Sequence, residues 1–282
     1  MNTASSSAIA VCAVDDDPCA ADVVATGRWL ASALALEPLF VRVSPAQPGR
    51  LPAALAEDLG ITVNEARVVT ADTPAQGIQR AVSEHNARLV VMGSRGQGAL
   101  ASAVLGSATR AVVARREVPV VVVRAGSVPV TFGGPLVCGV ADDNEDQVAL
   151  AQAAGRIASR LDVPLVLVHA LEPGAYRTGS ARLPGPRVEG DRRAAERKVA
   201  SVVAELPARL ETEVRIRDGS AAAAVVAVAD ERSADLIVLG HRARGALATA
   251  VTGSTALEVI AKGGRTTMLL PPQLAAGVLP AP

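Results

Sequence analysis

Short, almost wholly apolar runs alternate along the chain with longer segments of helical composition. In the first half, five such runs predict buried strands at residues 8–14, 39–43, 66–70, 89–92 and 118–123. The segments between them predict helices at residues 20–36, 51–59, 74–85 and 106–115. Strands that are apolar on both faces and separated by helices indicate a parallel sheet that helices cover on each side.

The second half repeats this alternation. Its apolar runs predict strands at residues 136–140, 165–169, 213–216, 236–239 and 266–270. We therefore predict an α/β chain of two tandem doubly wound domains, each a five-stranded parallel sheet with helices on both faces. If the strand order is 3-2-1-4-5, the order reverses between the first and fourth strands of each sheet.

The two halves are copies of one unit. The segment that begins at Leu89 recurs without gaps 147 residues later, at Leu236. The first strands recur at a shorter offset of 126 residues, from Cys12 to Cys138. The second half therefore carries about 21 extra residues between these two anchors.

The extra residues and the boundary between the halves both fall in turn-rich stretches. Residues 172–193 are rich in Gly, Pro and Arg, and we expect a surface loop there. A stretch with Gly and Pro at residues 125–134 separates two apolar strands. We therefore place the domains at residues 1–128 and 133–282.

The fifth predicted strand of each domain would lie at an edge of its sheet. Residues 118–123 are apolar on both faces, and an exposed edge of this kind invites pairing with another strand. Residues 266–270 are their counterpart. We expect the two edges to pair with each other, which would protect both and relate the domains by an internal pseudo-two-fold axis.

The composition argues against a nucleic-acid-binding protein. Among 282 residues, 28 are Lys or Arg and 28 are Asp or Glu, so the formal net charge is zero and no basic surface is expected. The only aromatic residues are Trp29, Phe40, Phe132 and Tyr176, so platforms for stacking unpaired bases are not expected either. Since 50% of the residues are hydrophobic, each domain can still build a core from Ala, Val and Leu.

The sequence carries no targeting signal that we can identify. Residues 1–7 lack the Lys or Arg with which a secretory signal begins. No apolar run approaches the roughly 18 residues that a membrane-spanning helix needs. Cys12, Cys19 and Cys138 form no Cys-x-x-Cys pair, so we expect free thiols and neither a zinc site nor a redox motif. These features together predict a cytoplasmic protein.

Candidate chemistry gathers after the first and fourth predicted strands. Asp15 ends the first strand and Gly93 ends the fourth. In the order 3-2-1-4-5, a carboxylate would thus face a glycine-rich loop across the crevice where this class of sheet binds ligands. Gly96 and Gly98 allow the backbone of that loop to approach a ligand closely.

The start of the following helix suits a phosphate group. Gly106 and Ser107 open this helix, and a helix N-terminus presents unpaired N–H groups and a positive partial charge. The hydroxyl groups of Ser107 and Thr109 can add donors, and Arg95 and Arg110 can add charge.

Each of these features also has a purely structural explanation. Glycines after a strand often only form a turn, and Gly-Ser before a helix is often only an N-cap. In the second copy, Thr255 and Glu258 have the spacing of a capping box. Gly96, Gly98 and Ala101 fit the dinucleotide fingerprint loosely, but that motif belongs after a first strand. No Gly-x-x-x-x-Gly-Lys-Ser/Thr loop occurs.

Taken together, Gly93-x2-Gly96-x9-Gly106-Ser107 resembles the ATP-binding signature of the universal stress protein family. Residues 13–18 resemble the first-strand motif of that family, so both sides of the crevice match at once. The resemblance covers nearly the whole chain as two tandem domains. It implies a five-stranded parallel sheet of order 3-2-1-4-5 in each of them.

The resemblance also implies how the first domain would hold ATP. Asp15 would contact the adenosine part, and Val43 would pack near the adenine. The ribose and the phosphates would be held by Met92, Gly93, Arg95, Gly96, Gly106, Ser107, Ala108 and Thr109. Mg²⁺ bound through the phosphates is compatible with this site, and no metal site built by the protein alone is expected.

The second domain departs from this pattern at two positions. Ala141 stands where the first domain has Asp15, although Asp142 is next in line and can partly substitute for that carboxylate. Ala243 stands where the first domain has Gly96. The retained residues make a second candidate set for the cofactor: Gly240, Arg242, Gly253, Ser254 and Thr255. We expect this second site to bind nucleotide more weakly or to be empty.

The function we predict is adenine-nucleotide binding in stress response or signalling, without a catalytic residue. One alternative is an enzyme that slowly hydrolyses ATP or transfers an adenylyl group in the same crevice. Another is a structural protein that binds a partner and whose two nucleotide sites are vestigial. The sequence offers no general base near the motif. The histidines, His85, His169 and His241, lie in separate segments and indicate structural or solvated roles. A homodimer of whole chains is compatible with the resemblance, and no membrane or nucleic-acid partner is expected.

Overall fold

The computed structural model describes residues 8–45, 51–94, 105–127, 132–141, 144–171, 187–241 and 254–277. At residues 187–191, 254 and 275–277 the description is of the backbone alone. Within these ranges, strands and helices alternate as the hydrophobic pattern predicts, with ends that differ by a few residues.

Strands and helices take turns in the first half. They are β1 (Ile9–Ala13), α1 (Ala20–Ala33), β2 (Glu37–Ser44), α2 (Ala53–Asp58), β3 (Ala66–Thr70), α3 (Pro74–Glu84), β4 (Leu89–Gly93), α4 (Ser107–Arg115) and β5 (Val120–Val123). The second half follows the same plan with longer helices. Its elements are β6 (Leu136–Gly139), α5 (Glu145–Leu161), β7 (Leu165–Leu171), α6 (Arg187–Ala204), β8 (Thr212–Asp218), α7 (Ala221–Glu231), β9 (Leu236–Gly240), α8 (Ser254–Lys262), β10 (Thr267–Leu270) and the 3-10 helix η1 (Pro272–Gly277).

Within the described ranges, the ten strands join one sheet, in the order β3-β2-β1-β4-β5-β10-β9-β6-β7-β8. Within each half the strands are parallel, and each half has the order 3-2-1-4-5, which confirms the prediction. The first strand of each half lies between the second and the fourth. Cys12 of β1 thus pairs with Phe40 of β2 on one side and with Val91 of β4 on the other. The strand order therefore reverses next to β1 and next to β6, which is where we look for a site.

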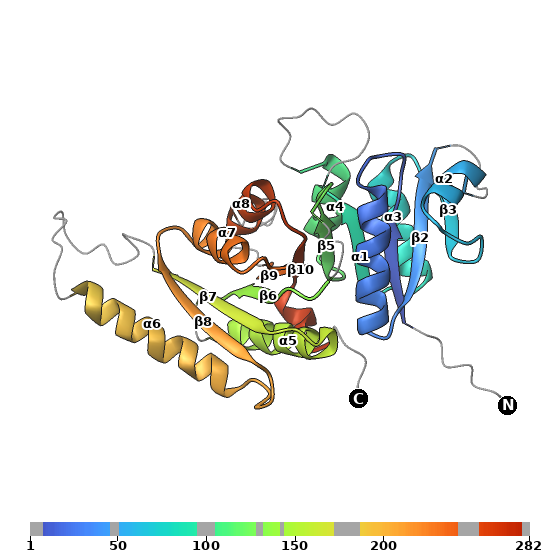
Figure 1. Ribbon diagram of the computed structural model, residues 1–282. Coiled ribbons are helices and arrows are strands. Elements are labelled where there is room, and N and C mark those ends of the chain that lie inside the picture. Colours follow the sequence, from blue (N-terminus) through green and yellow to red (C-terminus); the bar gives the residue numbers. More distant parts are fainter. Residues whose placement is uncertain are drawn as a thin grey trace.

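The two halves meet through their fifth strands. β5 and β10 pair in antiparallel fashion, with Val121 opposite Met268. Both of these side chains are fully buried. The expected pairing of the two sheet edges is thus confirmed, and it turns two apolar edges into interior strands. Figure 1 shows this seam between the blue-green half and the green-to-red half of the chain.

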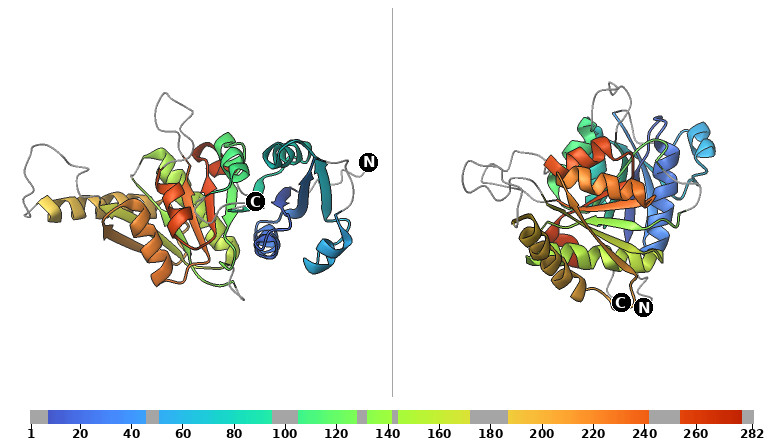
Figure 2. Two further views of the ribbon diagram at one scale, coloured as in Figure 1. Left: turned by 90° about the horizontal axis from the view of Figure 1, so that it is seen from above. Right: turned by 60° about the vertical axis from the view of Figure 1, so that its left-hand side comes forward.

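Helices cover the sheet on both faces. Alternate strand residues point to opposite sides, so Val11 and Cys12 belong to two different core clusters. One cluster packs against α1 and α5, and the other packs against α3, α4, α7 and α8. Figure 2 shows the two halves side by side, with α6 at the far end of the second half. The predicted two-faced α/β architecture is confirmed.

One expectation about loops is partly wrong. The surface loop that we expect over residues 172–193 gives way to helix α6 at Arg187. Residues 172–186 lie outside the described part of the chain. The last proline of the segment is Pro186, and the residues after it are mostly charged helix formers, so the segment changes character there.

The stretch between the halves is held to both of them. The Phe132 ring stacks on Trp29 of α1, with ring centroids 4.1 Å apart and an interplanar angle of 7°. The N–H groups of Gly133 and Gly134 both donate to Oδ2 of Asp235, each over 2.7 Å. An aromatic contact to the first half and two charge-assisted hydrogen bonds to the second thus fix the connection. The predicted domain limits fall at or beside residues outside the described ranges, and they stay predictions.

Candidate functional site

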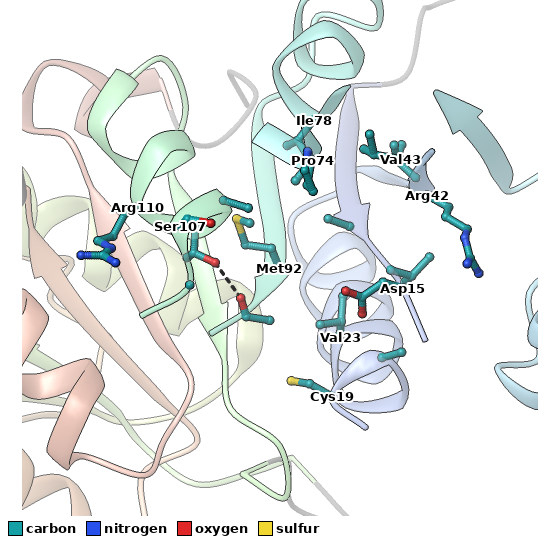
Figure 3. Close-up of a pocket in the computed structure, with 18 of the residues that line it drawn as sticks. Asp15, Cys19, Val23, Arg42, Val43, Pro74, Ile78, Met92, Ser107 and Arg110 are labelled. Carbon is teal, nitrogen blue, oxygen red and sulfur yellow. Dashed lines mark hydrogen bonds between the residues drawn. The ribbon is translucent and has the colours of Figure 1, made fainter. Parts of the chain in front are cut away.

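A cavity of about 450 Å³ opens at the carboxyl ends of β1, β2 and β4. It lies where the strand order reverses in the first half, because β1 is flanked there by β2 and β4. The starts of α1, α3 and α4 complete its walls (Figure 3). Of the first-domain residues named from the sequence, nine border this cavity: Asp15, Val43, Met92, Gly93, Gly106, Ser107, Ala108, Thr109 and Arg110.

The structure does not describe two of the named first-domain residues, Arg95 and Gly96. The same holds for Arg242 and Gly253 of the second domain. Their roles therefore stay predictions. For Ser254 only the backbone is described, at the start of α8.

A carboxylate stands at the end of β1. Oδ1 of Asp15 accepts a hydrogen bond from the N–H of Asp17 over 3.1 Å, which fixes the turn into α1. The β1 end itself is tied to β2, because the N–H of Val14 donates to the carbonyl of Val41 over 3.0 Å. In Figure 3 the Asp15 side chain lies in the space between the β2 end and α4. A rigid turn thus positions one negative charge at the cavity wall.

A bidentate ion pair lies next to Asp15 in the sequence and joins it to β2. Nη1 and Nη2 of Arg42 donate to the two carboxylate oxygens of Asp16, each over 2.6 Å. These hydrogen bonds raise the pKa of Arg42, and the negative charges of Asp16 and Asp15 raise it further against the effect of burial. The pair links the end of β2 to the turn after β1, so it braces the turn that carries Asp15.

The opposite wall is apolar. Val43, Pro74 and Ile78 border the cavity together, with Met92 facing them from β4 (Figure 3). Helix α3 approaches closely at Gly77, where an added Cβ would lie 2.5 Å from both methyl carbons of Val43. The absence of a side chain at Gly77 therefore lets Val43 line the cavity. Aliphatic walls of this kind suit a flat, weakly polar group such as a base.

The N-terminus of α4 supplies unpaired donors. Gly106 is the N-cap, and its own N–H donates to the carbonyl of Ser94 over 2.8 Å. The first helical hydrogen bond runs from the N–H of Arg110 to the carbonyl of Gly106. The N–H groups of Ser107 and Ala108 therefore precede the helical ladder, and no described residue accepts from them. Such a helix start attracts an anion.

The hydroxyl of Thr109, at the start of this helix, already has a partner. It donates to the carbonyl of Gly93 over 2.9 Å, and the side chain is buried. This hydrogen bond ties α4 to the end of β4. The role of Thr109 toward a phosphate stays a prediction. Arg110, which borders the cavity, points away from Asp15 in Figure 3.

The sequence patterns do not single out several residues of the cavity. Arg42, Pro74 and Ile78 border it, yet none belongs to a recognisable motif. The sequence does carry a signal for Arg42 and Pro74. Arg42 directly precedes Val43 at the end of a strand. Pro74 follows Thr73, the N-cap of α3, and a Pro at this position is typical of a helix start. Only the strand order brings these segments to one edge of the sheet.

The cavity also contains a thiol. Cys19 is buried and borders the cavity at the start of α1, where its Sγ donates to the carbonyl of Val123 over 3.4 Å. Burial raises the pKa of Cys19 to about 12, and Asp22, Asp17 and Asp15 raise it further. Because the thiolate is the nucleophile, this cysteine is a packing group and not a reactive one. Cys12, Cys19 and Cys138 are all free, as expected.

The corresponding region of the second domain differs in its chemistry. Ala141 follows β6, as the sequence indicates, and Gly240 ends β9. The capping box expected from Thr255 is wrong, because α8 already begins at Ser254 and places Thr255 inside the first turn. Glu258 instead pairs with Lys262, one turn further along the helix, over 2.6 Å.

His241 is a buried histidine directly after β9, with 2% of its surface exposed. Burial lowers its pKa to about 4, and the Arg116 guanidinium contributes to the shift. Its Nε2 has no hydrogen-bond partner among the described residues. The imidazole is therefore neutral at pH 7, and its protonated form is disfavoured in the folded protein.

This histidine predicts an acid-sensitive fold. Between pH 6.5 and about 4, His241 is protonated in the unfolded chain but still neutral in the folded one. The free energy of unfolding therefore falls as the pH drops through this window. The full loss is about 3 kcal/mol of unfolding free energy. Urea unfolding at pH 7 and at pH 4.5 measures it. The variant His241→Gln should lose about 2–3 kcal/mol less than the wild type between these two pH values. Equal losses would refute the assignment.

Two further findings concern metals and membranes. Within the described ranges, no three His, Cys, Asp or Glu side chains lie close enough together to hold a metal ion. Over the same ranges, no helix is both long enough and apolar enough to span a bilayer.

Comparison with known proteins gives a consistent result. Residues 9–124 and 135–269 each match the sequence model of the universal stress protein family. Universal stress proteins of Mycobacterium bovis and Mycobacterium tuberculosis are 31% identical to this chain over 182 residues, which is 62% of this chain. The matched region spans 59% of the length of these relatives.

Solved structures share the fold over nearly the whole chain. A universal stress protein from Archaeoglobus fulgidus superposes with a TM-score of 0.63 at 20% identity, covering 94% of this chain and 98% of that one. A functionally unknown protein from Pseudomonas aeruginosa gives a TM-score of 0.70 at 17% identity, covering 96% and 95%. At such identities the likeness concerns the fold.

Proposed function

The chain belongs to the universal stress protein family, and on this premise we propose that its first domain binds an adenine nucleotide in the cavity beside β1 and β4. The observation that carries the proposal is the division of this cavity into three chemically different parts. Aliphatic side chains stand at one end, the N-terminus of α4 stands at the other, and the Asp15 carboxylate borders the same space.

Each part suits one part of ATP. Val43, Pro74 and Ile78 offer an apolar wall for the adenine. The Asp15 carboxylate can accept a hydrogen bond from a ribose hydroxyl or from the adenine amino group. The N–H groups of Ser107 and Ala108 can donate to phosphate oxygens, where the α4 dipole also favours negative charge. Mg²⁺ would be held through those phosphates and water, because Mg²⁺ commonly keeps several waters beside phosphate ligands.

We propose binding in stress response or signalling, and not catalysis. The described lining of the cavity contains Asp15, Cys19 and the hydroxyl groups of Ser107 and Thr109 as its candidate bases or nucleophiles. A hydroxyl needs an adjacent base to become a nucleophile. Cys19 is protonated at neutral pH because its pKa is raised to about 12. A single carboxylate, itself engaged by the N–H of Asp17, is a poor basis for hydrolysis or adenylyl transfer. ATP hydrolysis that stops in an Asp15→Ala variant would favour the enzymatic alternative instead.

Calorimetric titration of the wild-type chain with ATP tests the proposal. We expect saturable binding of about one ATP per chain, because only the first domain keeps both the carboxylate and the intact glycine motif. Adenosine should bind more weakly than ATP, since it lacks the phosphates that would accept hydrogen bonds from the N-terminus of α4. GTP serves as the matched control for the base, and it should bind more weakly than ATP. Absence of saturable binding at millimolar ATP would refute the proposed function.

A further inference from the structure

The second domain has the same strand arrangement as the first but fills its crevice differently. β6 lies between β7 and β9 as β1 lies between β2 and β4. The crevice at the carboxyl ends of β6 and β9 is therefore the counterpart of the cavity in the first domain. The two crevices differ in the helix that follows the first strand of the domain. This helix is α1 in the first domain and α5 in the second.

In the first domain, α1 gives the cavity two small side chains. Ala20 and Val23, one helical turn apart, border it. In α5, two larger side chains at the same spacing reach the end of β9. A Cβ built on Gly240 would lie 3.2 Å from Cδ2 of Leu150 and 3.7 Å from Nε2 of Gln147. The Gln147 and Leu150 side chains therefore occupy the space beside Gly240 at the end of β9.

The carboxamide of Gln147 is held firmly in this place. Its Oε1 accepts a hydrogen bond from the N–H of Ala141, over 2.8 Å. Its Nε2 lies toward Gly240, so one side chain reaches from the end of β6 to the end of β9. Gln147 is 5% exposed. Its backbone is fixed as well, because its N–H donates to Oδ1 of Asn144, the N-cap of α5, over 3.2 Å.

The strand end beside β6 is closed by a similar internal contact. Nδ1 of His169, near the end of β7, lies 3.0 Å from the carbonyl of Val140. Val140 leads into Ala141, which lacks the carboxylate of Asp15. The N–H of Ala141 and the carbonyl of Val140, at the end of β6, thus both have hydrogen-bond partners within the protein. A nucleotide would have to displace hydrogen-bonded, buried groups before it could enter.

We propose that the second domain holds a latent adenine-nucleotide site that the side chain of Gln147 keeps closed, so that each chain takes up one nucleotide. The inference rests on the proposed function of the first domain, because the ligand class is taken from it. Gln147 acts as a plug in the crevice and makes no contact with the first-domain site. Shortening it removes the hydrogen bond to Ala141 and vacates the space beside Gly240.

The stoichiometry of ATP binding tests this inference. Equilibrium dialysis with radiolabelled ATP should give one site per chain for the wild type and two for Gln147→Ala. The new site should be at least about tenfold weaker, because Ala141 stands at the position of Asp15. Adding Ala141→Asp to Gln147→Ala should tighten the new site. Gln152→Ala is the matched control, since Gln152 lies on the exposed side of the same helix, and it should leave one site.

The outcomes separate this inference from the proposed function. One site in the wild type and still one in both Gln147→Ala and the double variant would overturn the plug and leave the function standing. Two ATP sites per chain in the wild type would also overturn the plug and leave the proposed function standing. No binding in the wild type would overturn both. If Gln147→Ala does not fold by urea titration, Gln147→Ser carries the same test with a shorter polar side chain.

Discussion

Replacing Asp15 by Ala is expected to weaken ATP binding by about 10- to 100-fold, because a hydrogen bond to a charged group contributes about 1.5–3 kcal/mol and about 1.4 kcal/mol corresponds to a factor of ten. The carboxylate borders the cavity at the end of β1, on a turn braced by the N–H of Asp17. Removing it takes away an acceptor for the adenosine part and leaves the α4 N-terminus unchanged.

The pattern across ligands makes this prediction specific. If Asp15 contacts the adenosine part, Asp15→Ala should weaken adenosine and ATP by the same factor. A loss confined to ATP would instead place the carboxylate near the phosphates or a bound Mg²⁺. Asp72→Ala is the matched control, because Asp72 is exposed after β3 and does not border the cavity. Calorimetric titration of the wild type and both variants measures these affinities, and an unchanged affinity in Asp15→Ala would contradict the assignment.

Much of the fold could be predicted because buried parallel strands are continuous apolar runs in the sequence. The predicted strand at residues 89–92 differs from β4 by a single residue. Helix ends were harder. The helix expected to reach residue 36 ends at Ala33, because Ala35 adopts a left-handed conformation with φ of 54°. Such a stop is usually marked by Gly, and an alanine gives no such signal.

The start of the fifth strand shows a similar limit. The apolar run begins at residue 118, yet β5 begins at Val120. Pro119 has no N–H and contributes only its carbonyl, which accepts from the N–H of Val90 over 3.0 Å. Composition alone therefore predicts a strand that is longer than its hydrogen-bonding groups allow.

The site could be predicted at its backbone landmarks and not in its side-chain partners. Asp15 and Gly106 follow from the strand order together with the family motif, since both lie at the ends of elements. The partner of Thr109 is a carbonyl sixteen residues earlier, and the partner of Gln147 is the N–H of Ala141. Such contacts depend on how a helix is set against a strand end, and no spacing along the chain encodes them.

Replacing Val121 by Asp is expected to lower the free energy of unfolding by more than about 4 kcal/mol, because it buries an unpaired charge. Val121 is fully buried in the middle of β5, between Val91 of β4 and Met268 of β10. With a net stability of about 5–15 kcal/mol for a typical protein, much of the variant should be unfolded at 25 °C or under mild denaturant. Circular dichroism during a urea titration measures the loss.

The matched control is the same substitution on a strand at the outer end of the sheet. Val214 lies in β8, which pairs only with β7 in the described sheet, and 39% of its surface is exposed. A carboxylate at this position stays hydrated, so Val214→Asp should lower the free energy of unfolding by less than about 1 kcal/mol. The difference between the two variants depends on β5 being an interior strand. If both variants lost equally little stability, the β5–β10 seam would not exist in solution, and the two domains would be joined only by their connecting segment.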